Sequence, residues 1–208
     1  MNFFSPLELL RTDPIAFLLL IACLVEAIAL HEYAHARMAD FQGDRLPRAM
    51  GRLSLNPARH LDPIGTLCLI LVGFGWGRPV EFRPTAFSSR RFGAALVALA
   101  GPLMNLFLAI AGAFTLAATS LGGLAGELLF YFVTLNVVLA VFNLIPLPPL
   151  DGSRLLTVFL PPSKQHVIFW LDRYGFLVLL VLVFFGGSLL GPLFAVVQRW
   201  VLQLAGIL

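Results

Sequence analysis

The sequence has few charged residues. Only 12% of its 208 residues are Asp, Glu, Lys or Arg, whereas 59% are hydrophobic. Soluble domains contain roughly 25% charged residues, so we do not expect a water-soluble globular protein. The net charge is only +3. The basic residues are therefore interpreted as markers of membrane topology, and no nucleic-acid partner is expected.

Cysteine is also scarce, with only Cys23 and Cys68 in the chain. Both lie in apolar stretches, which excludes a disulfide framework, and neither has a second Cys or His at metal-ligand spacing. The first ten residues lack the positive region of a secretory signal, and no small-residue cleavage site follows the first apolar run. We therefore do not predict a cleaved signal peptide.

Long apolar runs dominate the chain, and several reach the ~20 residues that a helix needs to cross a bilayer. They predict an all-α polytopic membrane protein: a bundle of about 4–6 transmembrane helices with a short membrane-embedded re-entrant or hairpin segment near 63–77. We expect one integral-membrane domain over 1–208. Its core would span about 14–155, and one or two C-terminal helices would span about 167–208. The predicted core spans are 14–37, 92–120 and 128–145.

Nine of the fourteen Lys and Arg residues lie between Arg37 and Arg91. The positive-inside rule places this stretch on the cytoplasmic side and the N-terminus outside. Within it, Pro63–Gly77 is apolar but has only 15 residues, with arginines on both sides. That length favours a re-entrant segment, and its glycines and β-branched residues favour a loop or hairpin. Such backbone is tolerated only against protein or a wet cavity, so it should border a functional site.

His31 and His35 lie at the end of the first apolar run, with Glu32 between them. Two histidines four residues apart share one face of a helix, and this H-E-x-x-H spacing is typical of zinc metalloproteases. The histidines would bind the metal, and Glu32 would be the general base. The alternative is that the two histidines only form hydrogen bonds to neighbouring helices. Ionisable groups inside a span usually face a functional interior, which favours the metal.

A catalytic zinc needs a third protein ligand and one open position for water. The candidates are Asp151, His60, His166, Glu26 and Asp62. Asp151 is favoured because Pro146 ends the preceding helix and Gly152 allows a tight turn behind the carboxylate. The alternative for Asp151 is an ordinary helix N-cap.

Three motifs in this order resemble the site-2 protease family of intramembrane zinc metalloproteases. They are HEYAH (31–35), AGPLMN (100–105) and the stretch from Asn143 to Asp151-Gly152; GRLSLNPARHLDPIG (51–65) and GWGRPV (75–80) resemble small prokaryotic members. The resemblance implies one Zn²⁺ per chain held by His31, His35 and Asp151, with Glu32 as the catalytic base. It implies cleavage of transmembrane segments, as in regulated intramembrane proteolysis. No PDZ or CBS domain fits within this length.

Three further residues are candidates for contact with the substrate or the transition state: Asn143, Asn105 and His60. An amide at Asn143 could bind the substrate backbone or a developing oxyanion. Each has a structural alternative. Asn143 could form a hydrogen bond between helices, and Asn105 could serve only in packing. His60 could stabilise the conformation of its loop. The embedded segment could also offer an edge strand to an unwound substrate.

Two other functions remain as alternatives, a metal transporter and a non-proteolytic membrane scaffold. A transporter should carry polar residues along several spans, whereas these ionisable residues gather at one depth. A scaffold needs none of His31, Glu32, His35 or Asp151. The expected partners are transmembrane protein substrates and the lipid bilayer. We expect a prokaryotic inner membrane, with the active site toward the cytoplasm; the oligomeric state is not predicted.

Overall fold

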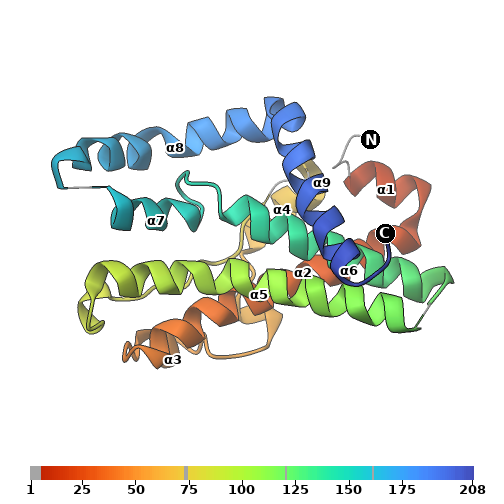
Figure 1. The fold of residues 1–208 in the computed structure, drawn as a ribbon, viewed down its shortest axis with the longest axis horizontal. Helices are drawn as coiled ribbons and strands as arrows, with labels where there is room; N and C mark the ends of the chain where they lie inside the picture. The colour runs from red at the N-terminus through yellow and green to blue at the C-terminus, as the bar shows by residue number, and fades with distance from the viewer. Residues whose placement is uncertain (1–5, 73–74, 120, 161) are drawn as a thin grey trace.

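The fold was analysed in a computed structural model that describes residues 6–72, 75–119, 121–160 and 162–208. All its regular elements are helices (Figure 1). The long helices are α2 (Pro14–Phe41), α5 (Arg90–Thr119), α6 (Gly123–Asn143), α8 (Gln165–Phe185) and α9 (Gly187–Leu204). The short ones are α1 (Pro6–Thr12), α3 (Leu46–Ala49), α4 (Pro63–Val72), α7 (Gly152–Phe159), and the 3₁₀ turns η1 (Pro57–Arg59), η2 (Pro84–Ala86) and η3 (Pro162–Lys164).

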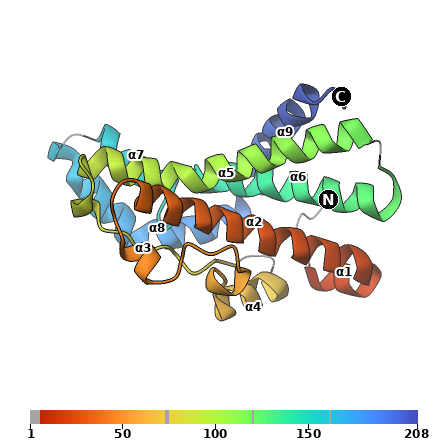
Figure 2. The same cartoon turned by 90° about the horizontal axis from the view of Figure 1, so that it is seen from below.

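Helices α2, α5 and α6 form the centre of the molecule (Figures 1 and 2). In the described residues, four helices are long and apolar enough to cross a membrane: Pro14–Phe41, Phe92–Thr119, Gly123–Asn143 and His166–Phe185. These helices confirm the predicted all-α polytopic membrane protein. Small buried residues such as Ala109 and Ala113 bring α5 close to Val133 and Val137 of α6. Between membrane-spanning helices, small residues of this kind permit close approach, and the van der Waals packing that results favours the bundle.

The residues at the starts of α2 and α6 explain where these helices begin. Asp13 caps α2 by accepting a hydrogen bond from the backbone N–H of Ala16 at 3.0 Å, and Pro14 occupies the first helical turn. That is the expected pattern of an N-cap residue followed by proline. Helix α6 begins at Gly123, where φ is +59°, five residues before the predicted start. Glycine tolerates this left-handed conformation, and the helix then continues through Gly126.

The embedded segment differs from the expected loop or hairpin because Pro63–Val72 forms the helix α4. Figure 2 shows α4 beside α2. Gly65 and Gly75 allow close contact between backbone segments and are not part of a β-strand. A Cβ on Gly65 would lie 2.1 Å from the carbonyl oxygen of Trp76, and one on Gly75 would lie 2.1 Å from that of Gly65. The chain therefore returns tightly against α4, where Leu61 and Gly77 form an isolated antiparallel bridge.

Helix α6 ends at Asn143, as predicted, but the following PLPP stretch is a series of turns instead of an extended strand. Leu147 and Leu150 donate backbone hydrogen bonds to Ile145 and Leu147, respectively, and Pro148–Pro149 is a cis peptide. Since proline supplies no backbone donor, this stretch cannot continue the helix. Helix α7 then starts at Gly152, close to the predicted restart.

Two helices follow α7. They divide at Gly186, five residues before the predicted boundary at Gly191–Pro192, and Pro192 lies inside α9. A Cβ on Gly186 would come within 2.3 Å of the carbonyl oxygen of Leu182, so the chain turns there with no space for a side chain. Only 11% of the most apolar window of α8 is buried, against 33–44% in the other three candidate spans. Of the four candidate spans, α8 is therefore the least buried within the protein.

Candidate active site

Three side chains converge where α2, α5 and the α6–α7 turns meet: His31, His35 and Asp151. The Nε2 atoms of His31 and His35 are 3.0 Å apart, and Asp151 Oδ2 lies 3.0 and 3.1 Å from them. Within the part of the chain that the structure describes, the geometry of these two histidines and one aspartate could hold a metal ion. Both imidazoles are buried, and Asp151 is half-buried.

The hydrogen bonds on the far side of each ring define its protonation. His35 Nδ1 lies 2.7 Å from the carbonyl oxygen of Val97, which can only accept, so this nitrogen carries the proton. His31 Nδ1 lies 2.6 Å from Asn105 Oδ1. In the neutral rings both Nε2 atoms then present lone pairs toward the carboxylate. Three acceptors about 3 Å apart repel one another unless a cation lies between them.

Zinc suits this donor set of two imidazoles and one carboxylate. Zinc–nitrogen bonds are about 2.0–2.1 Å long, so ligand atoms on one tetrahedral ion lie a little over 3 Å apart. The triangle formed by the two Nε2 atoms and Oδ2 is close to that size. The residues present therefore fit a zinc ion with little rearrangement.

A chain of amides behind His31 fixes its ring. Asn105 accepts from His31 Nδ1 and donates from Nδ2 to the carbonyl oxygen of Ala27 at 3.1 Å and to Asn136 Oδ1 at 2.8 Å. Asn136 donates in turn to the carbonyl oxygen of Phe132 at 2.9 Å. Both asparagines are 0% exposed. Such partners hold a ligating histidine in one orientation and one tautomer.

Helix α5 passes very close to the two imidazoles. A Cβ on Gly101 would lie 2.4 Å from His35 Nε2 and 2.6 Å from His31 Nε2, so only glycine fits. The next residue, Pro102, lies inside the helix and has no N–H to donate to the preceding turn. Val97, in that turn, directs its carbonyl to His35. The absence of a side chain at Gly101 thus lets the helix approach the site, and the carbonyl of Val97 supports the ring of His35.

Asp151 lies at the N-cap position of α7, but its side chain makes no capping hydrogen bond and faces the histidines instead. Gly152 makes this possible. A Cβ there would lie 2.3 Å from the carbonyl oxygen of Leu144 and 2.5 Å from that of Ile145. The close approach of the turn after α6 to the start of α7 sets the position of the carboxylate.

Glu32 is half-buried, and its Oε2 is buried with no hydrogen-bond partner in the part of the chain that the structure describes. Burying an unpartnered carboxylate oxygen is costly, so an unsatisfied one beside a metal-ligand cluster is suited to hold a water molecule or a substrate group. The backbone at Gly77 passes beside it: a Cβ on Gly77 would lie 3.5 Å from Glu32 Oε1.

Sequence reasoning missed the residues that hold this passing segment, residues 75–83. Arg52 is 4% exposed, and its guanidinium donates to the carbonyl oxygens of Arg59 and Arg78. The N–H of Arg78 donates to the carbonyl oxygen of His60 at 2.7 Å. A buried arginine beside the glutamate of the H-E-x-x-H motif is a pattern that burial reveals and sequence spacing does not.

The other candidates lie elsewhere. The ring of His60 is fully buried, and its Nε2 lies 2.6 Å from the carbonyl oxygen of Ser54. Asn143 is half-buried and donates to the carbonyl oxygen of Leu139 in its own helix. Asp62 accepts from the N–H of Gly65 at the start of α4, and His166 lies exposed on α8. Glu26 Oε2 is buried without a partner in the described residues.

Comparison with known proteins finds relatives that are named as zinc metalloproteases. A family model described as "Peptidase family M50" matches residues 117–182. The "Putative zinc metalloprotease YwhC" of Bacillus subtilis is 41% identical over 174 residues, 78% of each chain. The "Putative zinc metalloprotease Rip2" of Mycobacterium tuberculosis H37Rv is 33% identical over 208 residues, 92% of this chain and 75% of the relative. The protein of the same name from Mycolicibacterium smegmatis is 32% identical over 179 residues, 80% and 67% of the two chains. No solved structure matches significantly.

Proposed function

The chain belongs to peptidase family M50, the site-2 protease family, and from this premise we propose that it hydrolyses peptide bonds within or near transmembrane segments of membrane-anchored substrates. The coarser activity, a zinc metalloprotease in a membrane, follows from the family and the four apolar helices. The finer proposal depends on where the site lies: the His31, His35 and Asp151 donors lie among three helices long enough to cross a bilayer.

We propose that His31, His35 and Asp151 hold the zinc ion, with one position left for water. When bound, zinc supplies Lewis-acid chemistry that makes a water molecule acidic enough to lose a proton near neutral pH. The chain's own contribution is to fix the donors. Asn105 and Val97 hold the rings, and the turn at Gly152 holds the carboxylate.

Glu32 is the proposed general base. Its unpartnered Oε2 would take a proton from the attacking water as the oxygen bonds to the scissile carbonyl carbon. As the carbon–nitrogen bond breaks, the same carboxyl group would pass the proton to the leaving amine. Each turnover then returns Glu32 to its starting state.

The three tentative substrate residues take different proposed roles. Asn143 stays a candidate for contact with the substrate backbone, because its amide is half-buried and its bond to Leu139 lies within its own helix turn. Asn105 and His60 are better interpreted as positioning residues, since both side chains are fully buried, Asn105 contacts His31, and His60 Nε2 contacts the carbonyl oxygen of Ser54. His60 Nδ1 has no hydrogen-bond partner in the described residues. Asn105 would act on His31, and His60 on the loop that ends at the segment 75–83.

An unwound substrate needs partners for its exposed backbone groups. Residues 75–83 form no helix, Gly77 lies beside Glu32, and the segment pairs with other described backbone at the isolated Leu61–Gly77 bridge. We propose that the substrate adds to this segment as a strand, which would place its carbonyls beside Glu32. Helix α4 lies outside this pairing, so residues after it carry the proposed edge.

The domain and its orientation are also proposals. We propose one integral-membrane protease domain over 1–208 in a prokaryotic inner membrane, with the arginine-rich stretch from Arg37 to Arg91 at the cytoplasmic face. The ends of α2 and α5 that adjoin this stretch lie near the metal donors, so the active site would open toward the cytoplasm.

The test is cleavage in liposomes. Purified protein is reconstituted with a single-span substrate, and the cut site is mapped by mass spectrometry, with and without a zinc chelator. We expect zinc-restorable cleavage inside or at the edge of the span. Zinc movement across the liposome without cleavage would support the transporter alternative, and stable substrate binding without cleavage would support the scaffold; either result would overturn the proposal.

A further inference from the structure

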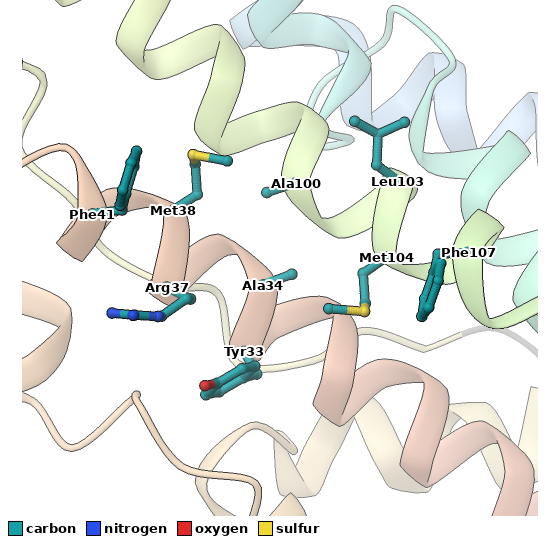
Figure 3. A pocket seen from close by; sticks show the side chains of 9 residues that line it. All are labelled: Tyr33, Ala34, Arg37, Met38, Phe41, Ala100, Leu103, Met104 and Phe107. Atoms are coloured by element: carbon teal, nitrogen blue, oxygen red, sulfur yellow. The ribbon is translucent and has the colours of Figure 1, made fainter.

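A groove runs along the outer surface of the α2–α5 pair (Figure 3). Its volume is about 400 Å³, and small residues, Ala34 of α2 and Ala100 of α5, lie within it. Larger apolar side chains flank them: Met38 and Phe41 on α2, and Leu103, Met104 and Phe107 on α5. The groove does not contain the zinc donors, which are not among its lining residues.

The groove follows two helices that are long and apolar enough to cross a membrane. From Tyr33 to Phe41 it extends about 12 Å along α2, at 1.5 Å per residue. One of its ends lies near Phe107, well inside α5, and the other lies near the end of α2. A narrow apolar groove of this length fits an extended hydrocarbon chain better than a second helix, which is about 10 Å across.

The end of the groove near Phe41 carries positive charge. Asp40 has a 2% exposed side chain and forms ion pairs with Arg37 at 3.3 Å, Arg45 at 3.1 Å and Arg48 at 2.8 Å. Three cations on one carboxylate leave this cluster with a net charge of +2. The side chain of Arg37 is 56% exposed and lines the groove, and Figure 3 shows it extending from α2 on the same side as Tyr33.

We propose that this groove is a binding site for an anionic phospholipid. One acyl chain lies between α2 and α5 along Ala34 and Ala100, and the headgroup phosphate contacts Arg37 and the excess positive charge around Asp40. Guanidinium groups bind phosphate with paired, charge-assisted hydrogen bonds. A basic residue at the surface of an anionic membrane contributes roughly 1 kcal/mol, equivalent to about fivefold in affinity.

The test compares phosphatidylglycerol with phosphatidylcholine of the same acyl chains, by native mass spectrometry of the detergent-solubilised full chain. The wild type should retain one phosphatidylglycerol per chain with at least about fivefold preference. Arg37→Gln should lose most of that preference. Arg199→Gln, which removes the same charge from an exposed position on α9, should keep that preference.

Two groove variants test the acyl-chain contact. Ala100→Phe should fill the groove and weaken binding of both lipids, and Leu103→Trp, on the exposed rim, should do the same if Ala100→Phe folds poorly. Equal binding of the two lipids by the wild type, or an unchanged preference in Arg37→Gln, would overturn the proposal. So would a protein dimer, free of lipid, that the groove variants dissociate.

Discussion

Gly101 shows how closely single residues are fitted at this site. Its Cα lies so near the two imidazoles that an added Cβ would be 2.4 Å from His35 Nε2 and 2.6 Å from His31 Nε2. Packed interiors do not absorb such overlaps without moving side chains or backbone. Behind the rings, Asn105 and the carbonyl of Val97 set their orientation. The donors are therefore confined from both sides.

Gly101→Ala should weaken zinc binding. The new methyl group would displace at least one imidazole, and loss of ligand orientation typically costs about 10- to 100-fold in metal affinity. Zinc affinity is measured by competition with a chromophoric chelator. Gly191→Ala is the matched control, because a Cβ at Gly191 meets nothing within 4 Å. Equal zinc affinity in both variants would contradict the close approach of α5.

Substitutions of Asn105 separate positioning from simple packing. Asn105→Leu leaves the Nδ1 proton of His31 without an acceptor, so zinc affinity should fall about 10- to 100-fold. Asn105→Asp keeps that acceptor and loses the donors to Ala27 and Asn136. We expect it to retain zinc much better than Asn105→Leu does, as read by zinc dissociation rates. If both variants bind zinc equally well, Asn105 does not position His31.

The segment 75–83 is held at two points. Near its start, Arg52 and His60 bind the backbone of Arg78. At its end, Asp44 is 0% exposed and accepts hydrogen bonds from the backbone N–H and the guanidinium of Arg83. Buried, bonded polar anchors of this kind fix loop geometry where no strand ladder does. The segment therefore passes Glu32 in a defined place.

Arg52→Gln should loosen the segment without disturbing zinc. Loss of the guanidinium releases the carbonyl of Arg78, so hydrogen exchange at residues 75–83 should accelerate, and KM for a transmembrane substrate should rise with little change in zinc content. Arg52→Lys should restore slow hydrogen exchange and the wild-type KM only in part, because an ammonium group lacks the fixed, planar set of donors of a guanidinium. Arg199→Gln, at an exposed position on α9, is the control. Unaltered exchange in Arg52→Gln would refute the anchoring role.

The second anchor predicts a pH dependence. Burial raises the pKa of Asp44, but hydrogen bonds from the backbone N–H groups of Arg83 and Leu46 and from the Arg83 guanidinium lower it more, so the pKa lies below the ordinary 3.8. Because folding lowers this pKa, the anchor contributes its full stabilisation above about pH 3.8. That stabilisation is lost as the pH falls through the lowered value.

Emission from Trp76, measured with Trp170 and Trp200 replaced by Phe, reports the release of the segment. The wild type should show a reversible change below pH 3.8. Asp44→Asn should show the released signal already at pH 7 and no step on acidification. A step of equal size in Asp44→Asn would assign the transition to another carboxylate.

At the scale of the whole molecule, the parts that were predicted are those set by local pattern. The shared helix face of His31 and His35 follows from helical periodicity, and Pro146 with Gly152 pointed to Asp151 as their partner, which the structure places within about 3 Å of both rings. The sequence did not reveal the contact of Asn105 with His31 or the anchors at Arg52 and Asp44, because these depend on how separate segments pack. The helix α4 was misinterpreted because its glycines serve close backbone contact instead of a hairpin.

The proposed metal joins the two halves of the bundle, since α2 supplies two donors and the turn after α6 supplies the third. The central claim is that Glu32 moves the proton at this site. The most direct measurement compares wild type and Glu32→Gln for cleavage of a reconstituted transmembrane substrate, with bound zinc determined in the same samples. We expect full zinc content and a loss of cleavage of at least about 100-fold in the variant. Cleavage that persists in zinc-loaded Glu32→Gln would contradict it.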